Sequence, residues 1–145
     1  MNARTPNLTF GLVPAEVLDI AWADAAPLLE KAINLMPNKF DMASIRESIE
    51  RGEHTLWIVM DGIKPVAAIL TRMIKYPKRR ALALDWMGGD RMTEWLPLVQ
   101  STLERYARDN DCAHLEGYGR EAWGRVLSKY NWKPAYVAYH MELSE

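Results

Sequence analysis

Hydrophobic positions along the chain recur with two periods, and the change from one period to the other separates strands from helices. Short alternating or continuous apolar runs bounded by Pro, Gly, Asn or Asp predict strands, and longer runs with apolar residues every three or four positions predict helices. Strands are expected over residues 8–13, 55–60, 66–74, 81–86, 113–118 and 135–143. Helices are expected over residues 19–36, from 41 or 44 to 51, over 93–108, and from about 121 to 130.

Two of these helices have ends or interiors that can be explained in more than one way. The first contains Pro27, which removes a backbone donor. Either this helix kinks at the proline, or Asp24 caps a shorter helix that has Pro27 in its first turn. The second helix begins at Asp41 or Ser44, both of which are good N-caps, and Gly52 ends it.

The connections between these elements predict a mixed sheet. Asp61-Gly62 and the segment 75–80 are turn sequences, so the three strands that they join are antiparallel neighbours. The strand at 81–86, the long helix and the strand at 113–118 form a crossover unit, which requires two parallel strands. We therefore predict one α/β (α+β) domain over residues 1–145, with helices flanking a mixed central sheet.

Composition excludes several classes of protein. Of the 145 residues, 49% are apolar and 26% charged, and the formal net charge is -1, so nothing global favours nucleic acid or an anionic membrane. No apolar stretch is long enough for a membrane span, and the amino terminus lacks the apolar core of a signal peptide. The single cysteine, Cys112, cannot form an internal disulfide, which is compatible with a reducing cytosol.

The order of elements, and several local stretches, resemble the Gcn5-related N-acetyltransferase (GNAT) fold over nearly the whole chain. The stretches are "LVPAEVLDIAWADAAPLLEKA", "RGEHTLWIV", "TRMIKYPKRRALAL", "CAHLEGYGREAWGRVL" and "YNWKP". They are most similar to the small GNAT-like proteins encoded by tailed bacteriophages and prophages. The resemblance implies two parallel strands, here 81–86 and 113–118, that splay apart to admit acyl-CoA. It also implies that the CoA pyrophosphate lies before the following helix, where backbone amides and the helix dipole favour an anion.

The stretch "WMGGDRMTEW" stands where the resemblance places the phosphate loop. The candidate cofactor-binding residues are Trp86, Met87, Gly88, Gly89, Arg91, Met92 and Thr93. The family's motif has Arg or Gln, two residues, Gly, any residue, and Gly or Ala. Here Gly88 takes the Arg/Gln position, while Arg91 and Thr93 take the two glycine positions, so the motif is broken. The Arg91 side chain could reach a phosphate, whereas Asp90 would repel it. Alternatively, Gly88-Gly89 only turns the chain, and Asp90 or Thr93 caps the helix.

Acetyl transfer to an amine needs a base for the amine and an acid for the leaving thiolate. Many GNAT enzymes take the acid from a Tyr in the last helix, and the resemblance places Leu127 at that position. Asp85 is the best candidate base and Tyr118 the best replacement acid, because both lie at the carboxyl ends of the expected parallel strands. Asp85 could instead pair with a lysine or arginine, and Tyr118 could be a packed aromatic residue.

The remaining polar residues show no other recognisable site. The three histidines are far apart in sequence and show no ligand spacing, so we expect no metal. The basic segment 75–80 is typical of a solvated hairpin tip, and a nucleic-acid contact there is a minor alternative. The inner positions of the sheet and of the helices that cover it predict six largely buried side chains: Trp57, Leu82, Leu84, Leu103, Leu115 and Val126.

Two functional hypotheses follow. The broken loop and the missing Tyr favour a divergent or non-catalytic GNAT-like phage protein that binds acetyl-CoA weakly or not at all. Its partners would be virion or assembly proteins, and its location the cytoplasm of the bacterial host or the virion. The retained splayed strands favour the alternative, an acyl-CoA-dependent N-acyltransferase that acts on an amine of a small molecule or a protein.

Overall fold

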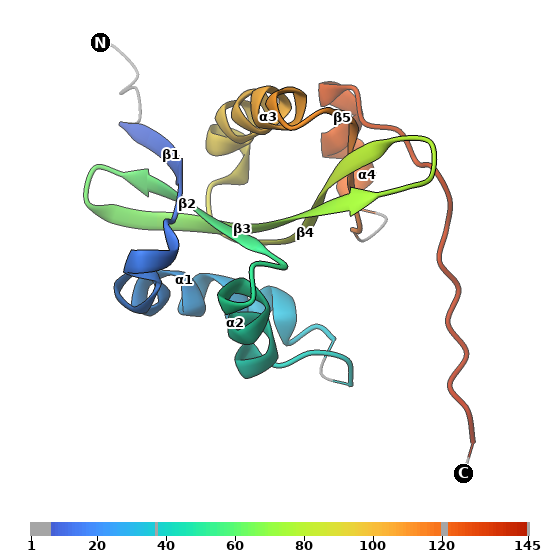
Figure 1. The fold of residues 1–145 in the computed structure, drawn as a ribbon, viewed down its shortest axis with the longest axis horizontal. Coiled ribbons are helices and arrows are strands. Elements are labelled where there is room, and N and C mark those ends of the chain that lie inside the picture. Colours follow the sequence, from blue (N-terminus) through green and yellow to red (C-terminus); the bar gives the residue numbers. More distant parts are fainter. Residues whose placement is uncertain (1–6, 37, 120–121, 145) are drawn as a thin grey trace.

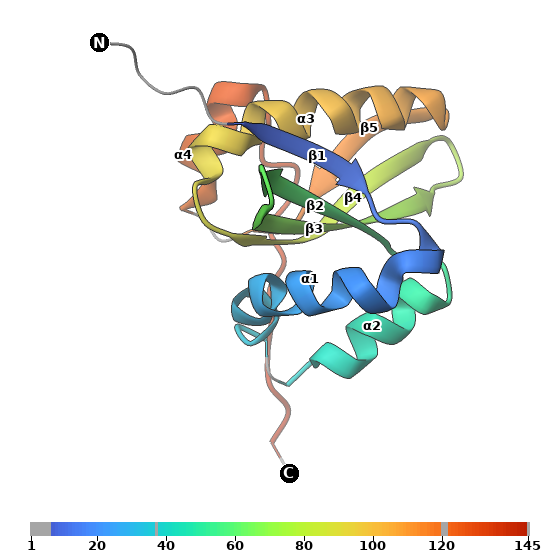
Figure 2. The ribbon, with the colours of Figure 1, turned by 90° about the vertical axis from the view of Figure 1, so that its left-hand side faces the viewer.

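The computed structural model of the protein describes residues 7–36, 38–119 and 122–144 (Figure 1). Its strands are β1 (Leu8–Leu12), β2 (Thr55–Asp61), β3 (Lys64–Lys75), β4 (Arg80–Gly89) and β5 (Cys112–Gly117). Its helices are α1 (Leu18–Ile33), α2 (Met42–Glu50), α3 (Met92–Asp109) and α4 (Trp123–Leu127). Helices α1 and α2 cover one face of the sheet and α3 covers the other, so the domain has three layers (Figure 2).

The five strands form one sheet in the order β1-β2-β3-β4-β5. Each neighbouring pair is antiparallel except β4 and β5, which are parallel and are joined by α3. This arrangement confirms the predicted mixed sheet and its crossover unit. The tight connections at 62–63 and 76–79 explain the antiparallel pairs, because such short links reverse the chain direction.

The sheet separates two hydrophobic clusters. One lies under α3 and includes Trp57, Leu82, Leu84 and Leu103, all buried as predicted. The other lies under α1 and α2. Leu115 and Val126 are only partly buried, contrary to the prediction. β5 is the edge strand and α4 has only five residues, so neither element is covered on all sides.

The helix boundaries follow local chemistry. Asp41 is the N-cap of α2, and its side chain and that of Ser44 bond to each other's backbone amides in a reciprocal capping box. Pro27 lies inside a single helix, α1, so the alternative of a shorter helix capped by Asp24 is wrong. The expected start of the last helix, near residue 121, lies outside the described residues, and α4 is described from Trp123.

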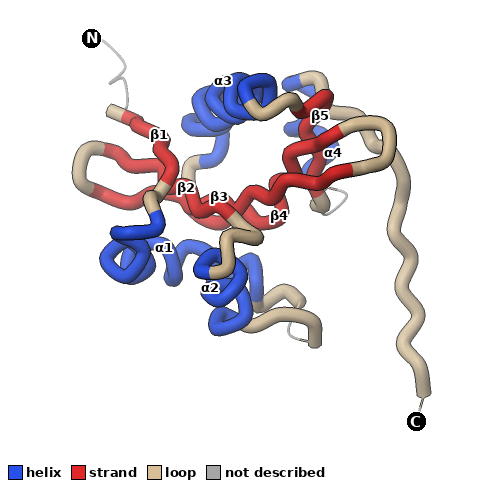
Figure 3. The backbone as a smooth tube through the Cα atoms, in the orientation of Figure 1, coloured by secondary structure: helices blue, strands red, loops and turns tan. Residues whose placement is uncertain are grey.

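The predicted last strand, residues 135–143, is wrong for this chain taken alone. These residues follow α4 as an extended segment with no strand beside it (Figure 3). The segment leaves the body of the domain near the β3–β4 hairpin and runs past the α1–α2 layer in both views (Figures 1 and 2). An apolar alternation predicts a strand only where a neighbour exists to pair with it.

Candidate functional site

The parallel strands β4 and β5 separate part-way along β4. Their last paired residues are Leu84 and Gly117, which come close enough that a Cβ on Gly117 would lie 3.3 Å from the Leu84 carbonyl oxygen. β4 then continues to Gly89 with β3 as its neighbour. Within the described residues, no strand therefore pairs with the outer edge of β4 from Asp85 onward. This is the splayed geometry that the resemblance predicted.

Asp85 lies at the separation point and is also the extra residue of a β-bulge between β3 and β4. The β3–β4 register pairs Thr71 with Leu84 and Leu70 with Trp86, which leaves Asp85 as the extra residue. Leu84 packs under α3, whereas Trp86 packs in the cluster on the α1–α2 side. The bulge turns the Asp85 side chain toward the α1–α2 side as well, where it meets His54, on the short link between α2 and β2.

The Asp85 carboxylate is surrounded by donors. Arg72 on β3 approaches it with Nε at 2.6 Å and Nη2 at 3.3 Å, and His54 Nε2 lies 2.8 Å away. The other ring nitrogen of His54 lies 2.9 Å from the Ser48 hydroxyl, which also bonds to the Ile45 carbonyl at 2.6 Å. Both nitrogens of His54 are therefore engaged within the protein.

These contacts decide the ionisation of Asp85. Burial raises the pKa of the carboxyl, but the hydrogen bonds from His54 and Arg72 outweigh it, and the pKa lies below the usual value. The predicted alternative, in which Asp85 pairs with a basic side chain, is confirmed. A carboxylate with a lowered pKa is a weak proton acceptor, so Asp85 is poorly suited to deprotonate an amine.

Tyr118 follows β5 directly and has a largely exposed side chain. The neighbouring Tyr136 hydroxyl and partial burial raise the pKa of Tyr118 to about 12, so the phenol keeps its proton at neutral pH. The structure relates Tyr118 to Asp85 through Arg72: the pKa of Arg72 is raised mainly by its hydrogen bond to Asp85 and, more weakly, by the nearby Tyr118. Asp85 thus lies on β4 and Tyr118 directly follows β5, the two strands that diverge, and Arg72 bonds to Asp85.

The two glycines of the expected phosphate loop lie inside β4 instead of forming a turn. Gly88 pairs with Ala68, and Gly89 pairs with Ala67. A Cβ on Gly88 would come within 2.1 Å of the Leu28 carbonyl oxygen, so glycine is required there by the close approach of α1. Gly89 has a φ of 137°, a conformation that favours glycine. The prediction that Gly88-Gly89 turns the chain is wrong. Packing explains the glycine at position 88, and backbone conformation explains the one at position 89.

Arg91 begins α3 as its N-cap, with left-handed backbone angles (φ 64°, ψ 36°). The alternative in which Asp90 or Thr93 caps the helix is therefore wrong. The Arg91 guanidinium bonds to Asp61 at 2.9 Å and to Glu94 at 2.6 Å. Both carboxylates raise its pKa further above the usual value. The side chain that was expected to reach a phosphate is therefore already held by two carboxylates.

Most of the other candidate cofactor residues pack into the domain. Trp86 contacts the edge of the Phe40 ring, and Met87 and Met92 pack against the cluster under α3. Trp95, expected to flank the loop, is buried, and its indole donates to the Asp90 carbonyl at 2.7 Å. Thr93 is exposed in the first turn of α3. A cofactor at this helix start would meet backbone amides, Thr93 and the Arg91 cluster.

The sequence prediction missed His54, Arg72 and Ser48. Arg72 was detectable in principle, because a cation on a strand next to Asp85 is a natural partner for it. His54 and Ser48 lie on the segment around the end of α2, and only the packing of α2 against the sheet brings them to β4. Residues distant in sequence and without a spacing motif give no signal before the fold is known.

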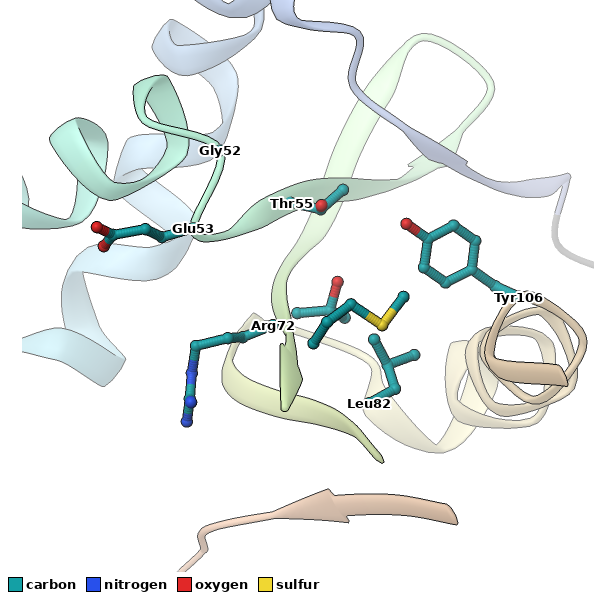
Figure 4. Close-up of a pocket in the computed structure, with 8 residues that line it drawn as sticks. Gly52, Glu53, Thr55, Arg72, Leu82 and Tyr106 are labelled. Carbon is teal, nitrogen blue, oxygen red and sulfur yellow. The ribbon is translucent and has the colours of Figure 1, made fainter. Parts of the chain in front are cut away.

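A pocket of about 290 Å³ opens beside this cluster (Figure 4). The pocket lies at the start of β2, between the β3–β4 hairpin and α3. It is lined by Gly52, Glu53, Thr55, Thr71, Arg72, Met73, Leu82 and Tyr106. The Tyr106 hydroxyl points from α3 toward Thr55 (Figure 4). Arg72 joins the pocket to Asp85, since it lines the one and bonds to the other.

Two further properties concern the part of the chain that the structure describes. There, no three His, Cys, Asp or Glu side chains gather in a way that could hold a metal ion. None of the described helices combines the length and apolar character needed to cross a bilayer.

Solved structures with the same arrangement include several acetyltransferases. An aminoglycoside acetyltransferase from an uncultured soil metagenomic sample, in complex with trehalose, is 12% identical with a TM-score of 0.66, over 95% of this chain and 97% of that one. The chain has the GNAT fold. A possible acetyltransferase from Clostridium difficile 630 is 13% identical with a TM-score of 0.63, over 95% and 99% of the two chains.

An aminoglycoside N-acetyltransferase in complex with CoA matches the same GNAT fold at 11% identity with a TM-score of 0.66, over 98% of this chain and 99% of that one. No protein-family model matches the sequence, and no curated protein matches it. Identities of 11–13% establish the fold alone.

Proposed function

We propose that this chain is a divergent GNAT-fold module that binds acetyl-CoA weakly or not at all and acts by binding a protein partner. The observation that carries the proposal is the engagement of Arg91 by Asp61 and Glu94 at the start of α3. A CoA pyrophosphate would approach this helix start, which in other proteins is a favourable place for an anion. Here the anion would meet side chains that are already negative.

The charges at this helix start oppose a phosphate. Asp61, Asp90 and Glu94 contribute three carboxylates within a short stretch of surface, against the single guanidinium of Arg91. The repulsion between a carboxylate and a phosphate charge at contact distance is about 1 kcal/mol in water and larger where the dielectric constant is lower. Releasing Arg91 for a phosphate would also leave two carboxylates without their partner.

The state of the candidate catalytic residues supports the same proposal. Asp85 is held ionised by Arg72 and His54, and both ring nitrogens of His54 are occupied. Leu127 stands where the resemblance places the usual acid. The lowered pKa of Asp85 and the two hydrogen bonds of the His54 ring leave neither residue well placed to act as a general base.

The similarity to small GNAT-like proteins of tailed phages and prophages supports a partner from the virion or its assembly, in the cytoplasm of a bacterial host. Immunodetection of the chain in purified virions of a phage that encodes it tests this part. Absence of the chain from both virions and assembly intermediates would contradict it.

One observation favours the alternative, an acyl-CoA-dependent N-acyltransferase. The separation of β4 from β5 leaves the outer edge of β4 without a described strand partner from Asp85 onward, and Tyr118, which directly follows β5, keeps its proton at neutral pH, as a general acid must. The acceptor would be an amine of a small molecule or a protein. Since solved relatives in fold act on aminoglycosides, an aminoglycoside belongs in the panel of amines to be tested.

Isothermal titration with acetyl-CoA separates the two functions. We expect no measurable heat or a millimolar Kd, which corresponds to only about -4 kcal/mol. The double variant Asp61→Asn/Glu94→Gln removes two negative charges and frees Arg91, so it should bind acetyl-CoA more tightly, by about tenfold or more. Glu104→Gln, at the opposite end of α3, is the matched control and should leave binding unchanged.

A micromolar Kd for the wild-type chain, lost in Arg91→Ala, would overturn the proposal. Release of CoA thiol from acetyl-CoA in the presence of the amine panel would then identify the acceptor. Loss of that activity in Tyr118→Phe would assign the acid, whereas an unchanged rate would remove Tyr118 from the mechanism.

A further inference from the structure

The extended segment after α4 carries an uncovered apolar face. Its odd-numbered residues Val137, Tyr139, Met141 and Leu143 have relative exposures of 68%, 92%, 79% and 80%. On the other face, His140 bonds to Glu142 at 2.7 Å, which is the spacing of side chains on one side of an extended chain. A period of two with one apolar face is the pattern of a strand that packs on a hydrophobic core.

The backbone of this segment is also unpartnered. Among the described residues, no backbone hydrogen bond joins residues 133–144 to another element, and no strand lies beside them. The segment is anchored only at its beginning. Gln100 on α3 accepts from the Trp132 indole and donates to the Tyr130 carbonyl, both at 2.9 Å. The chain is therefore fixed as far as Trp132 and leaves the body after it.

The outer edge of β5 could accept such a strand. β5 pairs with β4 on one side, and within the described sheet its other edge is free. Next to β5 lies a hollow of about 360 Å³ between α3 and residues 130–133, with Cys112, Leu115, Tyr130 and Trp132 in its lining. A strand added at this edge would obtain backbone partners and could place an apolar face over the hollow.

The path of the segment leads away from its own domain (Figures 1 and 2). Pro134 favours an extended conformation at Lys133, and Tyr136 lies near Tyr118, whose pKa it raises. From there residues 137–143 continue past the α1–α2 layer, away from their own domain, in both views (Figures 1 and 2). The apolar alternation covers seven residues, about the length of the six-residue β5.

We propose that residues 137–143 form a strand on the free edge of β5 of a second copy, and that two chains exchange these strands reciprocally. The exchange gives a two-fold symmetric dimer in which each β5 gains a neighbour and each apolar face is covered. The hinge is the segment 133–136. This assembly is independent of whether the GNAT domain binds acetyl-CoA.

The mass of the full chain in solution tests the proposal. Size-exclusion chromatography with light scattering, over about 1 to 100 μM protein, should give the dimer mass. Tyr139→Lys and Met141→Lys place a charge on the apolar face and should weaken the dimer by about tenfold or more. His140→Lys places the same charge on the polar face, beside Glu142, and should remain dimeric.

Hydrogen exchange adds a readout for the strand itself. The amides of residues 137–143 should exchange at least about tenfold more slowly in the dimer than in monomeric Tyr139→Lys. A wild-type chain that is monomeric at every concentration overturns the proposal, whether the segment is free or packed on its own β5. A dimer that is unaffected by both Tyr139→Lys and Met141→Lys, or whose 137–143 amides are unprotected, overturns it as well.

Discussion

Arg72 and Asp85 join the two central antiparallel strands through a two-point ion pair, with Arg72 Nε 2.6 Å and Nη2 3.3 Å from the carboxylate oxygens. The pair forms where the β-bulge makes Asp85 an extra residue of β4, and His54 completes it from the α2 side. In this position the carboxylate first serves to hold the Arg72 and His54 side chains in place. The pair links the β3–β4 hairpin to the end of α2.

Asp85→Asn should destabilise the protein at neutral pH. The variant loses charge-assisted hydrogen bonds, which contribute about 1.5–3 kcal/mol each when well formed; because Arg72 is partly exposed, we expect a total loss of about 1–3 kcal/mol in the free energy of unfolding. Urea denaturation at pH 7 measures it. Asp109→Asn, at the exposed end of α3, is the control and should change stability by less than about 0.5 kcal/mol.

The same pair predicts a pH dependence. The folded pKa of Asp85 lies below its usual value of 3.8, so the stabilisation is present above that value and is lost as the pH falls through the folded pKa. The stability difference between wild type and Asp85→Asn should therefore shrink progressively below about pH 4. A difference that stays constant from pH 7 to acid unfolding would contradict the assignment.

Truncation of the core under α3 should be costly. Leu103 is fully buried between α3 and the sheet, and Leu84 is nearly so. Leu103→Ala and Leu84→Ala should each lower the free energy of unfolding by about 2–5 kcal/mol, because a cavity remains. Ile63→Ala provides the comparison, since Ile63 is exposed in the β2–β3 turn and should change stability little. Equal melting behaviour of all three variants would be incompatible with this packing.

Gly88→Ala should loosen the contact between α1 and the sheet. The added Cβ would stand 2.1 Å from the Leu28 carbonyl oxygen, so α1 or β4 must move. Overpacking of this kind costs about 1–3 kcal/mol, and more when backbone must shift. Gly11→Ala on β1, where a Cβ meets nothing within 4 Å, is the control and should be nearly neutral. Thermal or urea unfolding that fails to separate the two variants would refute the close approach.

Tyr136→Phe should lower the pKa of Tyr118 from about 12 toward the ordinary value of 10.0, because the neighbouring Tyr136 hydroxyl is the largest cause of its elevation. A raised pKa means that this interaction stabilises the fold below pH 10 and is lost as the pH rises toward 12. Ultraviolet titration of the tyrosines measures the change. Tyr139→Phe is the control, and a pKa unaltered by Tyr136→Phe would show that the two phenols do not meet.

Local patterns were sufficient to predict most of the fold. The turn after Asp61 and the periodicity of α3 act over a few residues and were predicted correctly, and Asp41 was one of the two expected N-caps of α2. The parallel pairing of β4 and β5 followed from the length of their connection. The predicted strand at 135–143 was wrong for one chain because strand formation also needs a partner, which periodicity does not supply.

The candidate site was less predictable because its contacts join distant segments. His54 reaches Asp85 from 31 positions away, through the packing of α2 on the sheet. The Arg91 side chain was judged able to reach a phosphate, yet Asp61 holds it from the end of β2, on the other side of β3. The role of Gly88 depended on the path of α1, which local sequence does not specify.

The bulge at Asp85 also sets the parity of β4. Before it, even-numbered residues such as Leu84 face α3; after it, odd-numbered residues such as Met87 do, and Trp86 faces α1 and α2. Deleting this one residue would leave an uninterrupted strand whose inside-outside pattern is already continuous on both faces. Asp85, where β4 separates from β5, is therefore also the one residue of β4 that could be deleted without moving the later side chains to the opposite face of the sheet. Deletion of Asp85 would therefore remove its ion pair with Arg72 while the core side chains of β4 stay on their present faces of the sheet.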